Sequence, residues 1–160
     1  MKAVQISVIT ALLALPAFAQ HPSDWVAAGV AYNQYASPQI NGIAVYAHKI
    51  GGDDHAVYSF TSISFISTSS KPYRVSTVTE TGVAPLVRTI GRISVYGIAT
   101  GGVATSAVPD GTNVAAAFSG GGLAQITIGS GWTVGPYVRV LKATDADRQV
   151  AVGLLIGWGK

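Results

Sequence analysis

The stretch VAVGLLIGWGK, residues 150–160, decides the fold that this sequence predicts. Alternate positions form one apolar face, made up of Val150, Val152, Leu154, Ile156 and Trp158. This period of two predicts a β-strand, because successive side chains of a strand point to opposite sides. A strand with so apolar a face has to lie against a protein core or against lipid.

The whole chain is unusually poor in charge. Charged residues make up 11% of its 160 residues, against about 25% in average soluble proteins, and hydrophobic residues make up 49%. Such a surface faces water only if Ser, Thr and Gly cover it. Cysteine is absent, so disulfides cannot stabilise the fold. The net charge of +3 includes no basic cluster, which argues against nucleic-acid binding.

The first residues predict a secretory signal peptide. Lys2 provides a positive start, residues 3–15 are mostly apolar, and Ala17-Phe18-Ala19 forms a small-residue cleavage site. The apolar segment of about 13 residues is shorter than the ~20 that a membrane-spanning helix needs. We therefore expect residues 1–19 to be removed and residues 20–160 to form one mature domain.

The mature chain predicts an all-β fold of eight strands. Short runs rich in Val, Ile, Tyr and Thr are separated by turn signals, and no run is long and apolar enough for a transmembrane helix. The expected strands are 25–35, 40–50, 55–66, 73–81, 89–101, 113–128, 132–143 and 148–158. The predicted breaks include GVAP at 82–85 and one long loop at 102–111, and SGGG at 119–122 predicts a bulge or kink.

The alternation of faces leaves two architectures open. A soluble sandwich or barrel would turn the apolar faces inward, whereas an outer-membrane barrel would turn them outward to lipid. Charge placement favours the membrane barrel, because Glu80 alone of the seven acidic residues lies inside an expected strand. In the run 55–66 the alternation does not choose a face, since Tyr58 and Phe60 have one parity and Ile63 and Phe65 the other.

The three tryptophans favour the same choice. In an up-and-down barrel of eight strands, Trp25 and Trp132 begin odd-numbered strands and Trp158 ends the last one. All three then lie at one rim, which is the periplasmic rim if the chain starts there. Tryptophan prefers the membrane–water interface, so we expect an aromatic girdle.

A polar network is expected inside the barrel. Glu80 shares the face opposite the apolar residues with Arg74, Arg92, Arg139, Tyr96 and Tyr137. A buried carboxylate must be paired, and the sequence leaves Arg92 and Arg139 open as partners of Glu80. Eight strands enclose a space that side chains fill, so we expect a plugged, polar lumen.

Catalysis and metal binding have little support in the sequence. Asp53, Asp54 and His55 with Ser59 form a triad only on paper, because GGDDH is a turn. His48 and His55 flank this turn without a third convincing ligand. We expect no catalytic residue, no metal and no cofactor.

The sequence resembles the small bacterial outer-membrane β-barrels, of the kind of the OmpA transmembrane domain and OmpX. The family's last strand commonly reads polar-x-Gly-x-x-aromatic-x-aromatic, and Gly153, Ile156 and Trp158 fall at these spacings. The resemblance implies that the assembly machinery of the outer membrane reads this strand as an insertion signal. Ile156 replaces an aromatic residue, and Gly159 and Lys160 extend past the family's usual end.

The resemblance implies a monomeric, eight-stranded antiparallel barrel in outer-membrane lipid. Its expected role is non-enzymatic: structural, surface interaction, or a narrow channel. One alternative is a secreted soluble barrel or sandwich that binds a hydrophobic ligand, with Val152, Leu154 and Ile156 inside and Arg92 and Arg139 in water. Another is a lipid-modifying enzyme, which needs Ser, His and Asp together on the outer loops.

Overall fold

The computed structural model describes residues 21–33, 39–52, 55–68, 74–108, 111–144 and 148–160. The predicted signal peptide, residues 1–19, lies outside the described residues. The described chain forms eight strands: β1 (Asp24–Asn33), β2 (Gln39–Lys49), β3 (Val57–Thr68), β4 (Arg74–Ile90), β5 (Ile93–Val108), β6 (Gly111–Gly129), β7 (Trp132–Ala143) and β8 (Gln149–Gly159). Among the described residues, no helix is long and apolar enough to cross a membrane.

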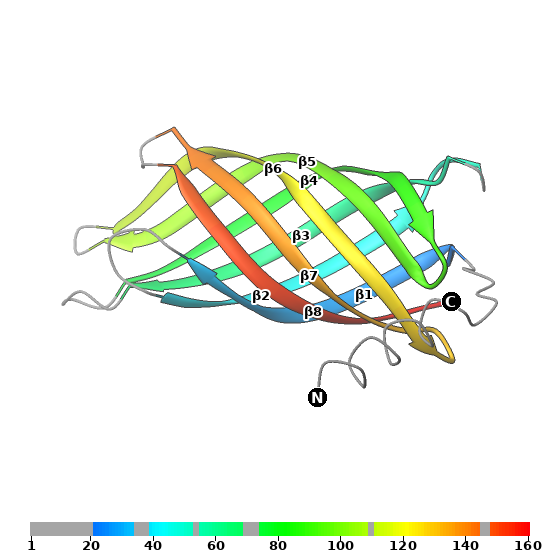
Figure 1. The fold of residues 1–160 in the computed structure, drawn as a ribbon. Coiled ribbons are helices and arrows are strands. Elements are labelled where there is room, and N and C mark those ends of the chain that lie inside the picture. The colour runs from blue at the N-terminus through cyan, green and yellow to red at the C-terminus, as the bar shows by residue number, and fades with distance from the viewer. Residues whose placement is uncertain (1–20, 34–38, 53–54, 69–73, 109–110, 145–147) are drawn as a thin grey trace, which may run out of the picture.

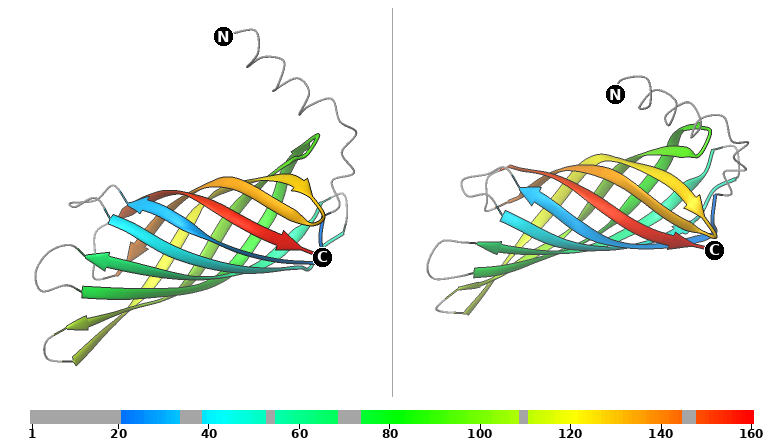
Figure 2. Two further views of the ribbon diagram at one scale, coloured as in Figure 1. Left: turned by 90° about the horizontal axis from the view of Figure 1, so that it is seen from below. Right: turned by 60° about the horizontal axis from the view of Figure 1, so that its bottom comes forward.

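The strands form one closed antiparallel barrel in sequence order, so the predicted fold is confirmed (Figure 1). Each strand pairs with the next, and β8 returns to pair with β1, beside which it lies in Figure 2. We call the end where β1 begins and β8 ends the near end, and the opposite end the far end. The β2–β3, β4–β5 and β6–β7 connections lie at the near end.

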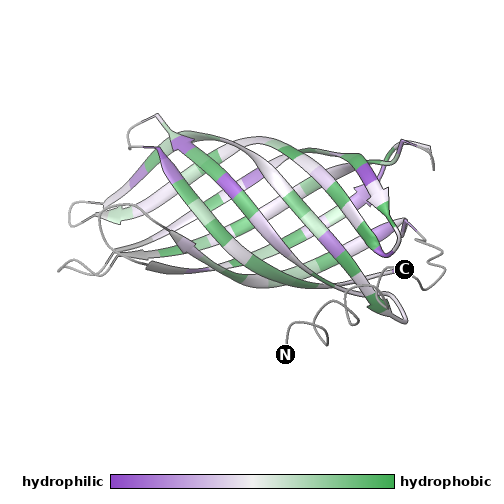
Figure 3. Ribbon diagram, viewed as in Figure 1, coloured by the Kyte–Doolittle hydropathy of each residue, from purple (hydrophilic) through white to green (hydrophobic). Residues whose placement is uncertain are grey.

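The alternation in β8 resolves which face points outward. Val152, Leu154 and Ile156 are each about half exposed on the outside of the barrel, whereas Leu155 is buried inside it. The same parity turns Tyr58 and Phe60 of β3 inward and Ile63 and Phe65 outward, which settles the face left open by the sequence. Hydrophobic residues run along the strands, and strongly hydrophilic ones lie mostly near the strand ends (Figure 3).

Several predicted breaks are wrong. GVAP does not end a strand, because β4 continues through Pro85 to Ile90 and turns at Gly91, whose φ is 58°. Pro85 is tolerated there because it pairs with Val57, the first residue of β3, at the end of that ladder. The described part of the expected long loop 102–111 is also strand, since β5 runs to Val108 and β6 begins at Gly111.

The glycines at 119–122 do not form a bulge either. Gly120, Gly121 and Gly122 pair regularly with both β5 and β7, and the register shifts of the barrel lie elsewhere, at Leu86/Arg88 and Thr127/Gly129. The lack of a side chain at Gly121 instead lets β6 and β7 approach each other closely. A Cβ on Gly121 would overlap the carbonyl oxygen of Val138 on β7.

The extension past Trp158 closes the barrel. Gly159 pairs with Trp25 of β1, and the backbone N–H of Lys160 donates to the Asp24 carbonyl at 3.0 Å. In return the Ser23 N–H donates to the Lys160 carbonyl at 2.9 Å. The two residues that fit the family pattern least therefore complete the seam between the first and last strands.

Candidate functional site

One buried ion pair crosses the barrel interior. Arg139 on β7 donates from Nη1 to Glu80 Oε2 on β4 over 2.8 Å, and the two side chains are 6% and 0% exposed. Strands β5 and β6 lie between them. Gly102 is paired with Glu80, and Gly121 is paired with Arg139. Because these glycines have no side chains, the long side chains of the pair have room to meet.

The ion pair belongs to a polar layer inside the barrel. Its inward side chains come from five consecutive strands: Ser62 and Ser64 on β3, Glu80 on β4, Thr100 on β5, Ser119 on β6 and Arg139 on β7. Thr100 and Ser119 are hydrogen-bonded through their hydroxyls at 2.6 Å. Glu80 Oε1, Arg139 Nε and Ser64 Oγ have no hydrogen-bond partner among the described residues, so the direct contact between the two charges provides most of the compensation for burying them.

Apolar clusters lie on both sides of this layer. Toward the far end, Ile66, Val78, Ala117 and Leu141 pack together. Toward the near end lies a larger cluster, which includes Trp25, Phe60, Ile98, Leu123 and Leu155. Small barrels fill their interiors with side chains, and here apolar side chains lie on either side of the layer around Glu80 and Arg139. Buried Asn41, Ser94, Gln125 and Thr133 add polar groups outside this layer, so the interior is a mixture of polar and apolar side chains.

The other predicted interior residues divide into three groups. Tyr96 and Tyr137 are buried inside the barrel, and the Tyr96 ring meets that of Tyr58 edge-on at 5.6 Å. Arg92 lies in the β4–β5 turn, because β5 begins only at Ile93, and in the described structure it forms no ion pair with Glu80. Arg74 begins β4, but its side chain lies outside what the structure describes.

A small cavity lies in the near-end cluster. Its walls come from six strands and are mostly aromatic or aliphatic: Trp25, Ala47, Tyr58, Phe60, Ala84, Tyr96, Leu123 and Gln125. Its volume of about 10 Å³ suits a single water molecule. The residues just before β1 lie over this region, where Tyr58 donates its hydroxyl to the Pro22 carbonyl at 2.8 Å. The cavity is too small for a substrate.

The tryptophans share the near end but not one face. Trp132 and Trp158 are paired across β7 and β8 and are 50% and 41% exposed on the outside. Trp25 is 4% exposed and points inward, where its Nε1 donates to Thr133 Oγ1 at 3.0 Å. The predicted girdle therefore loses Trp25, because the parity of β1 turns Val26 outward. Tyr46 on β2, 47% exposed, was missed as an outward aromatic residue of this end.

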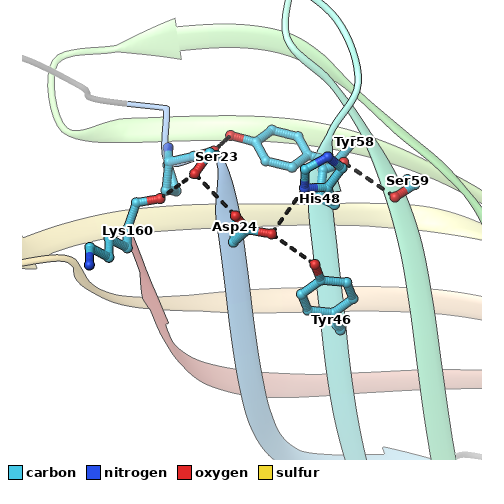
Figure 4. Close-up of polar contacts among 8 residues, drawn as sticks. Ser23, Asp24, Tyr46, His48, Tyr58, Ser59 and Lys160 are labelled. Atoms are coloured by element: carbon cyan, nitrogen blue, oxygen red, sulfur yellow. Dashed lines mark hydrogen bonds and ion pairs between the residues drawn. The ribbon is translucent and has the colours of Figure 1, made fainter.

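A polar cluster at the near rim was also missed (Figure 4). The Asp24 carboxylate accepts hydrogen bonds from Tyr46 Oη at 2.8 Å and from Ser23 Oγ at 3.1 Å, and it lies 3.0 Å from His48 Nδ1. Asp24 and His48 are direct partners in the β1–β2 ladder. Only the register brings them together, so the sequence held no signal for this contact.

The rim cluster has no catalytic or metal-binding geometry in the described residues. Ser59 donates to the backbone carbonyl of His48 at 3.3 Å, so its hydroxyl is not directed at the imidazole. No group of three His, Cys, Asp or Glu residues is present there. Asp53 and Asp54 lie outside the described residues, and His55 is exposed in the β2–β3 turn.

Comparison with solved structures identifies the fold. The attachment invasion locus protein Ail of Yersinia pestis is similar over 86% of this chain and 97% of its own, with 12% identity and a TM-score of 0.55. Neisserial surface protein A is similar over 86% and 96%, with 7% identity and a TM-score of 0.62. The N-terminal β-barrel domain of Pseudomonas aeruginosa OprF is similar over 88% and 100%, with 12% identity and a TM-score of 0.56.

The chain has the fold of the small outer-membrane β-barrels. The resemblance inferred from the sequence is thus confirmed for the fold, although no protein-family model and no curated protein matches the sequence. The dimensions agree with a membrane barrel. The 12 residues of β7, at about 3.3 Å each and a tilt of about 40°, reach roughly 30 Å along the axis, enough for an apolar band of about 25 Å.

Proposed function

We propose that this protein is a non-enzymatic bacterial outer-membrane barrel with a structural or surface-interaction role and a closed lumen. The proposal rests on the direction of the side chains of β8: Leu154 and Ile156 point to the outside of the barrel, and Leu155 points to the inside. The apolar exterior suits contact with lipid. Because the interior is filled by side chains, any water-soluble partner has to bind to the ends of the barrel that face water. The names of two neighbours, an attachment locus protein and a surface protein, support such a role.

A closed lumen is favoured over a narrow channel. The polar layer around Glu80 and Arg139 has an apolar cluster on each side, so a hydrated ion would have to pass two zones lined mostly by apolar side chains. The alternative of a soluble carrier needs Val152, Leu154 and Ile156 inside and Arg92 and Arg139 in water. Arg92 lies partly exposed in the β4–β5 turn, but the other four residues have the opposite arrangement, with Arg139 buried and the three apolar side chains outside.

Insertion by the outer-membrane assembly machinery and a monomeric state complete the proposal. Ile156 and Trp158 point outward on the last strand, where a partner can read them, and Gly153 lies on the inner face between them and the polar layer. Closure of β8 on β1 leaves no seam that would need a second subunit.

Two measurements on the refolded mature chain, residues 20–160, test the proposal. In vesicles we expect the shift of gel mobility on heating that folded membrane barrels show. In planar bilayers we expect no conductance above that of the lipid alone. A soluble folded monomer without detergent would refute the membrane assignment, and stable conductance steps would refute the closed lumen.

A further inference from the structure

A bulge in β4 turns Arg88 to the outside of the barrel near its near end. The register shifts between Leu86 and Arg88, so that Arg88 is paired with Val95 and not with Ser94. Ser94 is buried inside the barrel, whereas Val95 faces outward. Bulges often change the direction of a side chain in this way. Arg88 is accordingly exposed, and Arg92 lies partly exposed in the turn that follows, so the hairpin brings two cations to the near end.

Rows of paired residues climb toward the far end from β1 to β8. The row that begins at Trp25, close to the near rim, ends at Gln149, the first residue of β8 at the far end. Strands of an eight-stranded barrel are tilted by about 40° and lie about 4.8 Å apart, so each step to the next strand climbs about 3 Å. Each residue along a strand covers about 2.5 Å of the barrel axis at this tilt. The two increments give the relative depth of residues on different strands.

Arg88 lies at the depth of Trp132. The row from Ile90 crosses β5 and β6 and reaches Val134 on β7, which is therefore about 9 Å closer to the far end. Trp132 lies two residues back from Val134, and Arg88 lies two residues forward from Ile90, so the two differ in depth by only about 1 Å. Tryptophan prefers the membrane–water interface. On the proposed function, which the inference depends on, Arg88 lies among the lipid head groups of the periplasmic leaflet.

The surroundings of Arg88 suit a ligand that is anionic at one end and apolar at the other. Neither Arg88 nor Arg92 forms an ion pair with another residue that the structure describes. Val87 and Ile90, which flank Arg88 on β4, are 69% and 49% exposed. Guanidinium groups bind phosphate through parallel hydrogen bonds, and a lipid phosphate carries apolar chains beside it.

Beyond the arginines, the outer face of β5 and β6 has very small side chains. Gly97 is paired with Gly122, and Ala99 with Gly120. The barrel does not need glycine there, because a Cβ on these three glycines would meet its nearest neighbours at ordinary contact distances of 3.5 to 3.8 Å. Glycine inside a strand weakens it and often marks the close approach of another group. We call these outward residues the bare strip: Gly97, Ala99, Gly101, Gly120 and Gly122.

The bare strip is bordered on three sides and continues to the arginines on the fourth. Val83 of β4 and Val138 of β7 border it laterally, and each is 43% exposed. At its far end the Phe118 ring lies beside Gly101, where a Cβ would be 3.5 Å from the ring. The depth from Arg88 to Gly101 is about 18 Å, close to the ~15 Å of half a hydrocarbon core. The strip therefore has the length of one leaflet.

We propose that Arg88 and Arg92 bind the phosphate of a glycerophospholipid of the periplasmic leaflet, and that one of its acyl chains lies along the bare strip. The charge of the phosphate complements the two arginines, and the length of the strip matches one chain. A lipid of the outer leaflet would bring its phosphate to the far end, where Phe118 closes the strip.

Native mass spectrometry of the folded mature protein in detergent, titrated with dioleoyl phosphatidylglycerol, tests the phosphate contact. We expect one tightly retained lipid per wild-type protein. R88Q/R92Q should weaken its binding about fivefold, and each single substitution only about twofold, because both guanidinium groups are accessible to water. Dioleoylglycerol has similar chains but no phosphate, so it should bind equally to wild type and to R88Q/R92Q.

Variants that fill the bare strip test the acyl chain. G120V/G122V places two side chains on the strip, and we expect it to weaken the binding of both lipids about tenfold. A99L fills the strip from a position that is not glycine, and it replaces the glycine variant if that variant does not fold. G42V is the matched control, because Gly42 is another outward glycine with open space but lies on β2. It should bind within about twofold of wild type.

Several results would overturn the inference. A wild type that retains no phosphatidylglycerol would do so, as would equal binding by wild type, R88Q/R92Q and G120V/G122V, or a loss in G42V as large as that in G120V/G122V. Lipid A retained in place of phosphatidylglycerol would assign the strip to the outer leaflet, and a dimer that disappears in G120V/G122V would assign it to a second copy. The gel shift on heating, measured on the same samples, shows separately whether the barrel has folded, so a failure of the proposed function is distinguished from a failure of the lipid site.

Discussion

Removing one partner of the buried ion pair should destabilise the barrel strongly and specifically. Glu80 is fully buried and Arg139 nearly so, with 2.8 Å between the bonded atoms. R139M leaves a carboxylate inside the barrel without its cation. Breaking a buried pair in this way costs about 3–5 kcal/mol, which lowers the ratio of folded to unfolded protein by roughly 10²–10⁴.

The double variant E80L/R139M tests whether the loss of stability comes from the unpaired charge or from changing the side chains at these two positions. With both charges gone, the layer between the two apolar clusters becomes apolar, and replacing a whole buried pair is often nearly neutral. We expect the double variant to recover most of the loss, giving a coupling free energy of at least about 2 kcal/mol.

Urea unfolding from lipid vesicles, followed by tryptophan fluorescence, measures these free energies. R88M is the matched control, because Arg88 is exposed on β4, and its effect should stay within about 0.5 kcal/mol. The reasoning would be refuted if E80L and R139M each lowered the free energy of unfolding by less than about 1 kcal/mol. It would also be refuted if the loss in E80L/R139M equalled the sum of the losses in the two single variants.

Two further predictions concern packing and the membrane face. G102A should fail to fold or lose more than about 2 kcal/mol, because a Cβ there would overlap the β4 backbone, whereas G42A, with open space around it, should change stability little; the folded fraction on a gel measures both. Brominated lipids should quench Trp132 and Trp158 in single-tryptophan variants but leave Trp25 bright, and equal quenching of all three would contradict the inward placement of Trp25.

Eight strands, and the outward faces of most of them, could be predicted from the sequence because a two-residue period survives in those runs. The run 55–66 is an exception, since its apolar residues occupy both parities. The predicted span 132–143 coincides with β7, Trp132–Ala143, since a glycine-containing turn precedes it and its alternation is strict. Strand ends were harder to predict. Glycine and proline usually signal turns, but in this barrel Gly102 lets two strands approach closely and Pro85 lies beside the end of a ladder.

Contacts between distant strands depend on register, which the alternation does not supply. The sequence left Arg92 and Arg139 equally open as partners of Glu80. The choice follows from where β5 begins, since a start at Ile93 places Arg92 in a turn. The rim contact between Asp24 and His48 likewise needs the β1–β2 pairing. Trp25 was placed at the correct rim but on the wrong face for a different reason: the alternation of β1 turns Val26, Val30 and Tyr32 outward and therefore Trp25 inward.

Most inward and most outward side chains of this barrel are apolar. Hydrophobicity alone therefore does little to fix the pairing register of its strands. At positions 154 and 155 of β8, exchanging the inner for the outer face would cost little, because leucine suits both lipid and core. The same exchange on β4 or β7 would turn Glu80 or Arg139 toward lipid, where arginine costs roughly 2–4 kcal/mol at the midplane. The polar layer therefore distinguishes the inner face from the outer on the strands that carry it. If so, E80L/R139M keeps its stability but loses a unique register, and its amide spectrum should show several sets of peaks where the wild type shows one.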